Sequence, residues 1–107
     1  MGIWKATTVD ITPELKLTQW RIFEVESSLW EGKSRHFCGY NLTEREGRVS
    51  SEIVSFNKEN MTGITKSGRV YKLTGDSGFN KDALYVWGIW SARNDISECI
   101  DISETFN

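Results

Sequence analysis

The dipeptide Ser67-Gly68 is the feature that most constrains the fold, because it joins two segments with strong β propensity. Residues 61–66 and 69–74 are rich in threonine, isoleucine, valine and tyrosine, which favour strands. Glycine accepts the positive φ that a tight turn between antiparallel strands requires. The pattern therefore predicts a β-hairpin over residues 61–74 and a chain built mainly of strands.

The segment 16–26 is expected to be a strand with two apolar faces. Trp20 and Ile22 share one face, and Phe23 and Val25 share the other. A strand that is apolar on both sides is typical of the centre of a sheet, or of a strand interrupted by a bulge.

Three further segments carry strand patterns. Alternation of side chains predicts a half-buried strand over residues 35–43. β-Branched and apolar residues predict strands at 49–56 and 96–102, and polar or glycine-containing turns separate the segments. The pattern as a whole indicates five to six strands.

The segment 80–93 is the one helix that the sequence predicts. Asn80 is a preferred N-cap residue, and Arg93 suits the last turn. The body is apolar on almost every side and contains Gly88, so a fully buried strand is the alternative. A helix here would pack one apolar side over an open end or face of the sheet, with these residues: Leu84, Trp87 and Trp90.

Length and composition bound the fold class. A chain of 107 residues, 38% hydrophobic and 26% charged, suits one folded domain over residues 1–107. We expect a mostly β (α+β) domain, either a small antiparallel β-barrel or a strongly bent sheet of five to six strands, with one helix in the C-terminal half. No apolar run reaches the ~20 residues of a membrane-spanning helix, and the start lacks a signal-peptide pattern. A cytoplasmic protein without a membrane partner is therefore expected.

The hairpin segment and the segment that follows it resemble small uncharacterised bacterial and prophage β-rich proteins. The resemblance rests on GITKSGRVYKLTG at 63–75, followed by Tyr-Val-Trp at 85–87 and by Trp90. It covers about the second half of the chain. It implies a phage or mobile-element origin, but it brings no defined activity and no functional residue.

Enzymatic chemistry finds little support among the motifs. No HExxH, P-loop, GxGxxG or GxSxG pattern occurs, and His36 is the only histidine. His36 falls in phase with Cys38, so a nucleophile and base on one strand face is an alternative to two buried structural side chains. Cys38 and Cys99 are too few for a zinc site of four thiolates, and no CxxC occurs. We therefore expect a non-enzymatic protein with no cofactor and no metal.

Binding to a host protein is the favoured function. One candidate surface is an acidic ladder, which would imitate phosphates, made by Asp95, Glu98, Asp101 and Glu104. Two tryptophans beside expected loops or ends, Trp4 and Trp30, are candidate exposed anchors, because tryptophan is enriched at interface hot spots. The interpretation is an inhibitor that occludes a host defence or nucleic-acid enzyme, sterically or electrostatically. An immunity or antitoxin protein that neutralises a basic partner is an alternative.

Binding of single-stranded nucleic acid is the other alternative. Residues 33–72 carry eight basic and four acidic side chains, a formal charge of +4, and small barrels bind single strands through basic faces with stacking aromatics. The candidate cations are Arg35, Arg48, Lys66, Arg69 and Lys72. The overall net charge of −2 opposes this function, and the sequence leaves the oligomeric state open.

Overall fold

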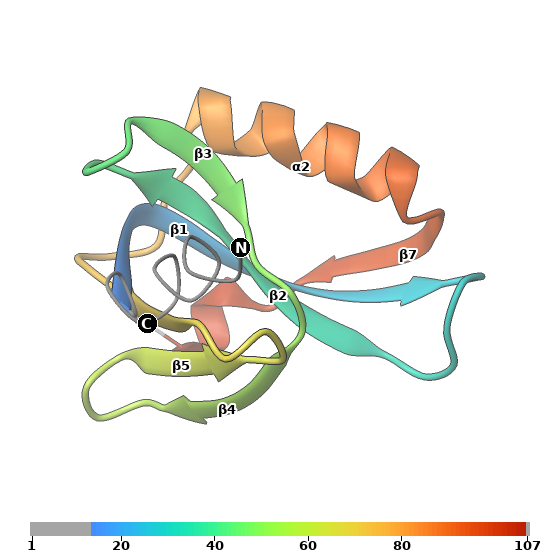
Figure 1. Ribbon diagram of the computed structural model, residues 1–107, viewed down its shortest axis with the longest axis horizontal. Helices are drawn as coiled ribbons and strands as arrows, with labels where there is room; N and C mark the ends of the chain where they lie inside the picture. Colours follow the sequence, from blue (N-terminus) through green and yellow to red (C-terminus); the bar gives the residue numbers. More distant parts are fainter. Residues whose placement is uncertain (1–13, 107) are drawn as a thin grey trace, which may run out of the picture.

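A bent β-sheet carries one α-helix across part of one face (Figure 1). The computed structural model describes residues 14–106. Its elements, in chain order, are β1 (Glu14–Ser27), β2 (Ser34–Asn41), β3 (Glu46–Val49), β4 (Ile53–Asn57), β5 (Thr62–Thr65), β6 (Val70–Leu73), α2 (Lys81–Arg93), β7 (Ile96–Asp101) and the short 3-10 helix η1 (Ser103–Phe106).

β1 is the centre of the sheet. The strand order is β3-β2-β1-β6-β5-β4, and β7 pairs with β1 off this path. The N-terminal part of β1 pairs in parallel with β6, and its C-terminal part pairs antiparallel with β7. The register with β2 shifts between Thr18 and Arg21, and Gln19 between them has a φ of 49°. The predicted central, bulged strand is confirmed, and the bulge bends β1.

Within residues 14–106 the sheet is open and has seven strands, so the predictions of a β-barrel and of five to six strands are both wrong. The parallel pairing of β1 with β6 also departs from the expected antiparallel arrangement. The end strands β3 and β4 follow each other in the chain, but no ladder joins them. The predicted strand 49–56 breaks between them because Ser50 turns toward β2. The amide of Ser50 donates to the carbonyl of Phe37 at 2.9 Å, and the hydroxyl of Ser50 accepts from the amide of Phe37 at 2.8 Å. Of the two predicted forms, the bent sheet agrees with the structure and the barrel does not.

The two apolar faces of β1 belong to two cores. Trp20 and Ile22 pack in the larger core, and Phe23 and Val25 pack in the smaller core under α2. The half-buried strand expected at 35–43 is instead buried on both faces at its centre, since the larger core covers one face and α2 the other.

The segment 81–93 is a helix and not a buried strand. The side chain of Asn80 caps it by accepting from the amide of Ala83 at 3.0 Å, as the sequence predicted. Trp87 and Trp90 pack against the smaller core as predicted. Leu84 does not, because it is 36% exposed, and the buried Ala83 belongs to that core instead. Among the described residues, neither helix has the length and apolar character needed to cross a membrane.

The predicted hairpin is confirmed as β5 and β6. Gly68 has a φ of +89°, and the amide of Thr65 donates to the carbonyl of Arg69 at 3.0 Å. The turn brings Lys66 toward the loop after β3, since the Lys66 amide donates to the Glu52 carbonyl at 2.7 Å.

Candidate functional site

A cavity of about 420 Å³ lies where the end of the β1–β2 hairpin meets the C-terminal end of α2. Four separate segments contribute to it, namely the β1–β2 turn with the start of β2, the loop after β3, the β5–β6 turn, and the end of α2. Its lining residues are Trp30, Glu31, Lys33, Ser34, His36, Ser51, Glu52, Lys66, Trp90 and Asn94.

Aromatic rings form one wall of the cavity. The centroids of Trp30 and Trp90 lie 6.4 Å apart, and Trp90 stacks on Trp87 at 5.1 Å. Trp30 was expected to be an exposed anchor, but it is half-buried, and its ring is a wall of the cavity. Its Nε1 atom is buried and has no hydrogen-bond acceptor within residues 14–106.

His36 lines the cavity, and both nitrogens of its neutral ring form hydrogen bonds within the protein. Nδ1 lies 2.9 Å from the carbonyl of Ser50, and Nε2 lies 2.8 Å from the hydroxyl of Ser34. A carbonyl can only accept, so Nδ1 carries the proton and Nε2 accepts from Ser34. Burial lowers the pKa of His36 and outweighs the opposing effects of the Ser50 carbonyl and the Glu52 carboxylate.

Cys38 does not form a nucleophile–base pair with this ring. The side chain of Cys38 is fully buried, and its thiol donates to the carbonyl of Ala83 at 3.4 Å. Burial, with a smaller contribution from Asp101, raises the pKa of Cys38 to about 12. The reactive thiolate is therefore disfavoured at neutral pH.

Charges of both signs surround the mouth of the cavity. Glu31 and Lys33 lie on the β1–β2 side, and Glu52 and Lys66 lie on the opposite side, where a backbone hydrogen bond links them. Lys33 reaches Glu24 only at 3.9 Å. The four side chains leave the rim neutral overall and able to pair with ligand groups of either sign.

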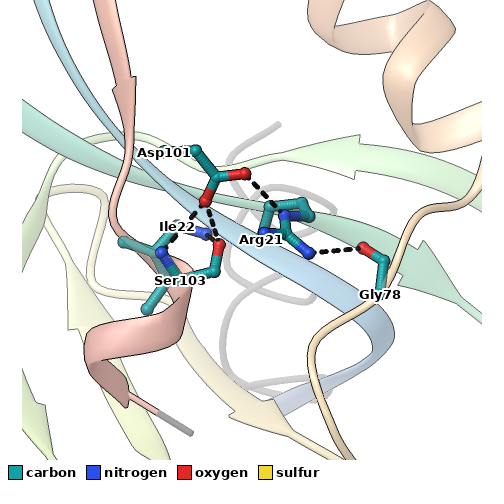
Figure 2. A network of polar contacts seen from close by, with 5 residues as sticks. All are labelled: Arg21, Ile22, Gly78, Asp101 and Ser103. Carbon is teal, nitrogen blue, oxygen red and sulfur yellow. Dashed lines mark hydrogen bonds and ion pairs between the residues drawn. The ribbon is translucent and has the colours of Figure 1, made fainter.

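The acidic residue Asp101 is part of a structural network (Figure 2). Its carboxylate lies 2.8 Å from Nε of Arg21, and the amide and hydroxyl of Ser103 donate to its other oxygen. The Ser103 hydroxyl in turn accepts from the amide of Ile22. Burial would raise the pKa of Asp101, but the hydrogen bonds from Ser103 and Arg21 outweigh it and lower the pKa. This network ties β7 and η1 to β1.

The four predicted ladder residues do not form one row. In β7, Glu98 lies opposite Glu26 of β1, three residues before Asp101, and side chains three apart in a strand point to opposite faces. Asp95 lies in the turn before β7 with a φ of 51°, and Glu104 lies in η1. The spacing of three, which the sequence interpretation treated as a ladder, separates these carboxylates in a strand.

Two of the five predicted nucleic-acid-binding cations are paired within the fold. Nε of Arg35 lies 3.0 Å from the carboxylate of Glu24. Arg48 lies 3.0 Å from the carboxylate of Glu46 and donates to the hydroxyl of Tyr71 at 3.2 Å. Each of these two arginines therefore already has a carboxylate partner, which a phosphate would have to displace.

The other three cations belong to the β5–β6 hairpin. Lys66 and Arg69 lie in its turn, and Lys72 in β6 donates to the carbonyl of Asn60 at 2.5 Å. Together with Arg35 and Arg48, they are distributed over three strands and a turn, and only Lys66 lines the cavity.

Trp4 lies outside the described residues. Within residues 14–106, no group of three His, Cys, Asp or Glu side chains is placed to hold a metal ion. No protein-family model, no curated protein and no solved structure matches the chain.

Sequence reasoning missed most of the cavity. It singled out Trp30, His36 and Lys66 separately, and it assigned Trp90 to the core and Glu52 to no site. The one local signal was the run Trp-Glu-Gly-Lys at 30–33, where a large aromatic residue sits inside a charged turn.

Proposed function

We propose that this chain is a non-enzymatic binding protein that occludes a surface of a protein partner, with the cavity beside Trp30 and Trp90 receiving a side chain of that partner. The partner class is the one expected from the sequence, a host defence or nucleic-acid enzyme inhibited by a phage- or mobile-element-encoded protein. An immunity or antitoxin protein would use the same kind of contact.

The observation that carries this proposal is the cavity wall of two indoles beneath a rim of mixed charge. Tryptophan dominates binding energy at interfaces when it lines a well-packed pocket that excludes water. Concave apolar sites with a few convergent polar groups are the usual form of a binding site.

Two features support binding over catalysis. Both ring nitrogens of His36 are engaged by Ser34 and Ser50, so the imidazole lacks a free position for proton transfer. The Cys38 thiol is fully buried and donates to the carbonyl of Ala83, so it does not reach the cavity. The other polar residues that line the cavity include four charged side chains, which are suited to recognition: Glu31, Lys33, Glu52 and Lys66.

The nucleic-acid alternative is less well supported, because Arg35 and Arg48 are paired with carboxylates. Counterion release requires cations that are free to neutralise phosphates. Within residues 14–106 Lys66 forms no ion pair, but the acidic Glu52 also lines the cavity near it.

Affinity capture with rim variants tests the proposal. Tagged wild-type protein, Glu52→Lys, Lys66→Glu and the control Lys81→Glu would be used to capture partners from host lysate, with and without nuclease. Lys81 is exposed at the opposite end of α2 and does not line the cavity. We expect a nuclease-resistant protein partner that both rim variants lose and the control retains. Nuclease-sensitive capture that Glu52→Lys strengthens would instead support nucleic-acid binding.

A further inference from the structure

β7 is a sheet edge with one unpaired side. It pairs with β1, and within residues 14–106 no strand pairs with its other side. Every residue of β7 after Ile96 is exposed. An exposed edge offers a row of backbone N–H and C=O groups to another strand.

One hydrogen bond fixes which backbone groups face outward. The amide of Ile102 donates to the carbonyl of Ile22 at 2.9 Å, so Ile102 is directed toward β1. Because backbone groups alternate along a strand, those of Ile100 are also directed toward β1, and those of Cys99 and Asp101 lie on the unpaired side.

The side chains around this edge indicate what kind of strand it would accept. Glu98 lies opposite Glu26, and Ile100, which is 51% exposed, shares the face of Glu98. A second copy of this chain would present the same strand, which has no lysine or arginine between Ile96 and Asp101 to pair with Glu98. A lysine or arginine beside Glu98 and an apolar residue beside Ile100 would be favourable.

We propose that the unpaired edge of β7 binds an extended basic segment of a partner protein as an additional strand. Main-chain hydrogen bonds to Cys99 and Asp101 supply affinity, and Glu98 with Ile100 selects a basic and an apolar side chain two residues apart. This surface is separate from the Trp30–Trp90 cavity, and the proposal does not depend on it.

Designed peptides test the edge directly. The probe is an acetylated and amidated peptide, TKTVTKT, which places lysine and valine on one face. Its controls are the acidic peptide TETVTET and a copy of the probe that is N-methylated at every backbone amide. The protein variants are Cys99→Pro, which removes an outward N–H at an edge where proline is tolerated, Cys99→Ser, which keeps it, and Glu98→Lys. Binding is measured by calorimetry and by amide exchange in NMR spectra.

The expected result is binding of TKTVTKT with new exchange protection at the amides of Cys99 and Asp101. Binding should weaken at least about tenfold for Cys99→Pro, for Glu98→Lys and for TETVTET, and it should persist for Cys99→Ser. The N-methylated copy should not bind, and this holds whether or not Cys99→Pro folds well.

Three results would overturn the proposal. Equal binding of the N-methylated copy would exclude strand addition, and equal binding of TETVTET would exclude selection of a basic segment. Absence of peptide binding, or self-association through β7 in light scattering, would exclude this kind of partner. None of these results bears on the rim variants of the cavity, so the two proposals can fail separately.

Discussion

The imidazole of His36 lies 4.6 Å from the indole of Trp90, centroid to centroid, with the ring planes tilted by 55°. This contact joins the second strand of the sheet to the last turns of α2. Both rings line the cavity, so the packing that holds the helix on the sheet also shapes the candidate site.

Protonation of His36 should destabilise the fold. Burial holds the folded-state pKa of His36 below its ordinary value of about 6.5, so the unfolded chain takes up the proton first as the pH falls. The free energy of unfolding should therefore decrease as the pH falls from about 6.5 through the folded pKa. Urea unfolding at several pH values would measure this decrease, and His36→Asn should reduce it, because asparagine does not titrate. An identical pH slope in the variant would contradict this assignment.

Gly47 should be required for the position of α2. A Cβ atom built at Gly47 lies 2.6 Å from the Cα of Ala83, at the start of the helix. Gly47→Ala should lower the free energy of unfolding by about 1–3 kcal/mol, because the helix must move away from β3.

Gly88 provides the matched control for that substitution. It lies on the exposed side of α2, and a Cβ there would meet no atom within 4 Å. Gly88→Ala should raise the free energy of unfolding by about 1 kcal/mol, since alanine is the better helix former. Thermal unfolding of both variants measures these two changes in the free energy of unfolding. An equal change at the two positions would show that close packing at Gly47 is unimportant.

The ion pair of Asp101 should stabilise the protein above its unfolded pKa. The folded pKa of Asp101 lies below the ordinary value, so its contribution is present above about pH 4 and is lost as the pH falls through the folded pKa. Asp101→Asn should lower the free energy of unfolding by about 1–2 kcal/mol at pH 7. The difference between wild type and variant, measured by urea unfolding, should shrink toward pH 2. A difference that stays constant with pH would argue against an ionised, paired Asp101.

Trp87 should contribute more to stability than its neighbour Leu84. Its indole stacks on Phe23 with centroids 4.3 Å apart, whereas Leu84 is 36% exposed. Trp87→Ala should cost about 3 kcal/mol and Leu84→Ala less than about 1 kcal/mol, measured by chemical denaturation. Equal losses would mean that the helix packs through a different face.

Local signals predicted the elements well, because each is determined by its own residues. Gly68 and its flanking strands specified the hairpin, Asn80 specified the start of the helix, and the two faces of Trp20 and Phe23 specified a central strand. The break at Ser50 was not predictable, since it depends on hydrogen bonds to Phe37, which lies in another strand.

The candidate site depended on contacts that no local pattern contains. The hairpin end with Trp30 and the helix end with Trp90 are 60 residues apart in the sequence, and they meet because α2 packs against β2 and β3. The acidic ladder failed for a related reason. The regular spacing of the acidic residues in the sequence suggests that their side chains lie close together. In β7, however, Glu98 and Asp101 are three residues apart and point to opposite faces of the strand.

The indole N–H resonances of the tryptophans provide the most direct test of the cavity as a partner-binding site. Trp30 and Trp90 line the cavity, whereas Trp20 is fully buried and its indole donates to the carbonyl of Gly75 at 3.0 Å. Titration with the captured partner, followed by ¹H–¹⁵N NMR, should shift or broaden the Trp30 and Trp90 signals and leave the Trp20 signal unchanged. Binding of the partner with no change at Trp30 and Trp90 would contradict a role for the cavity.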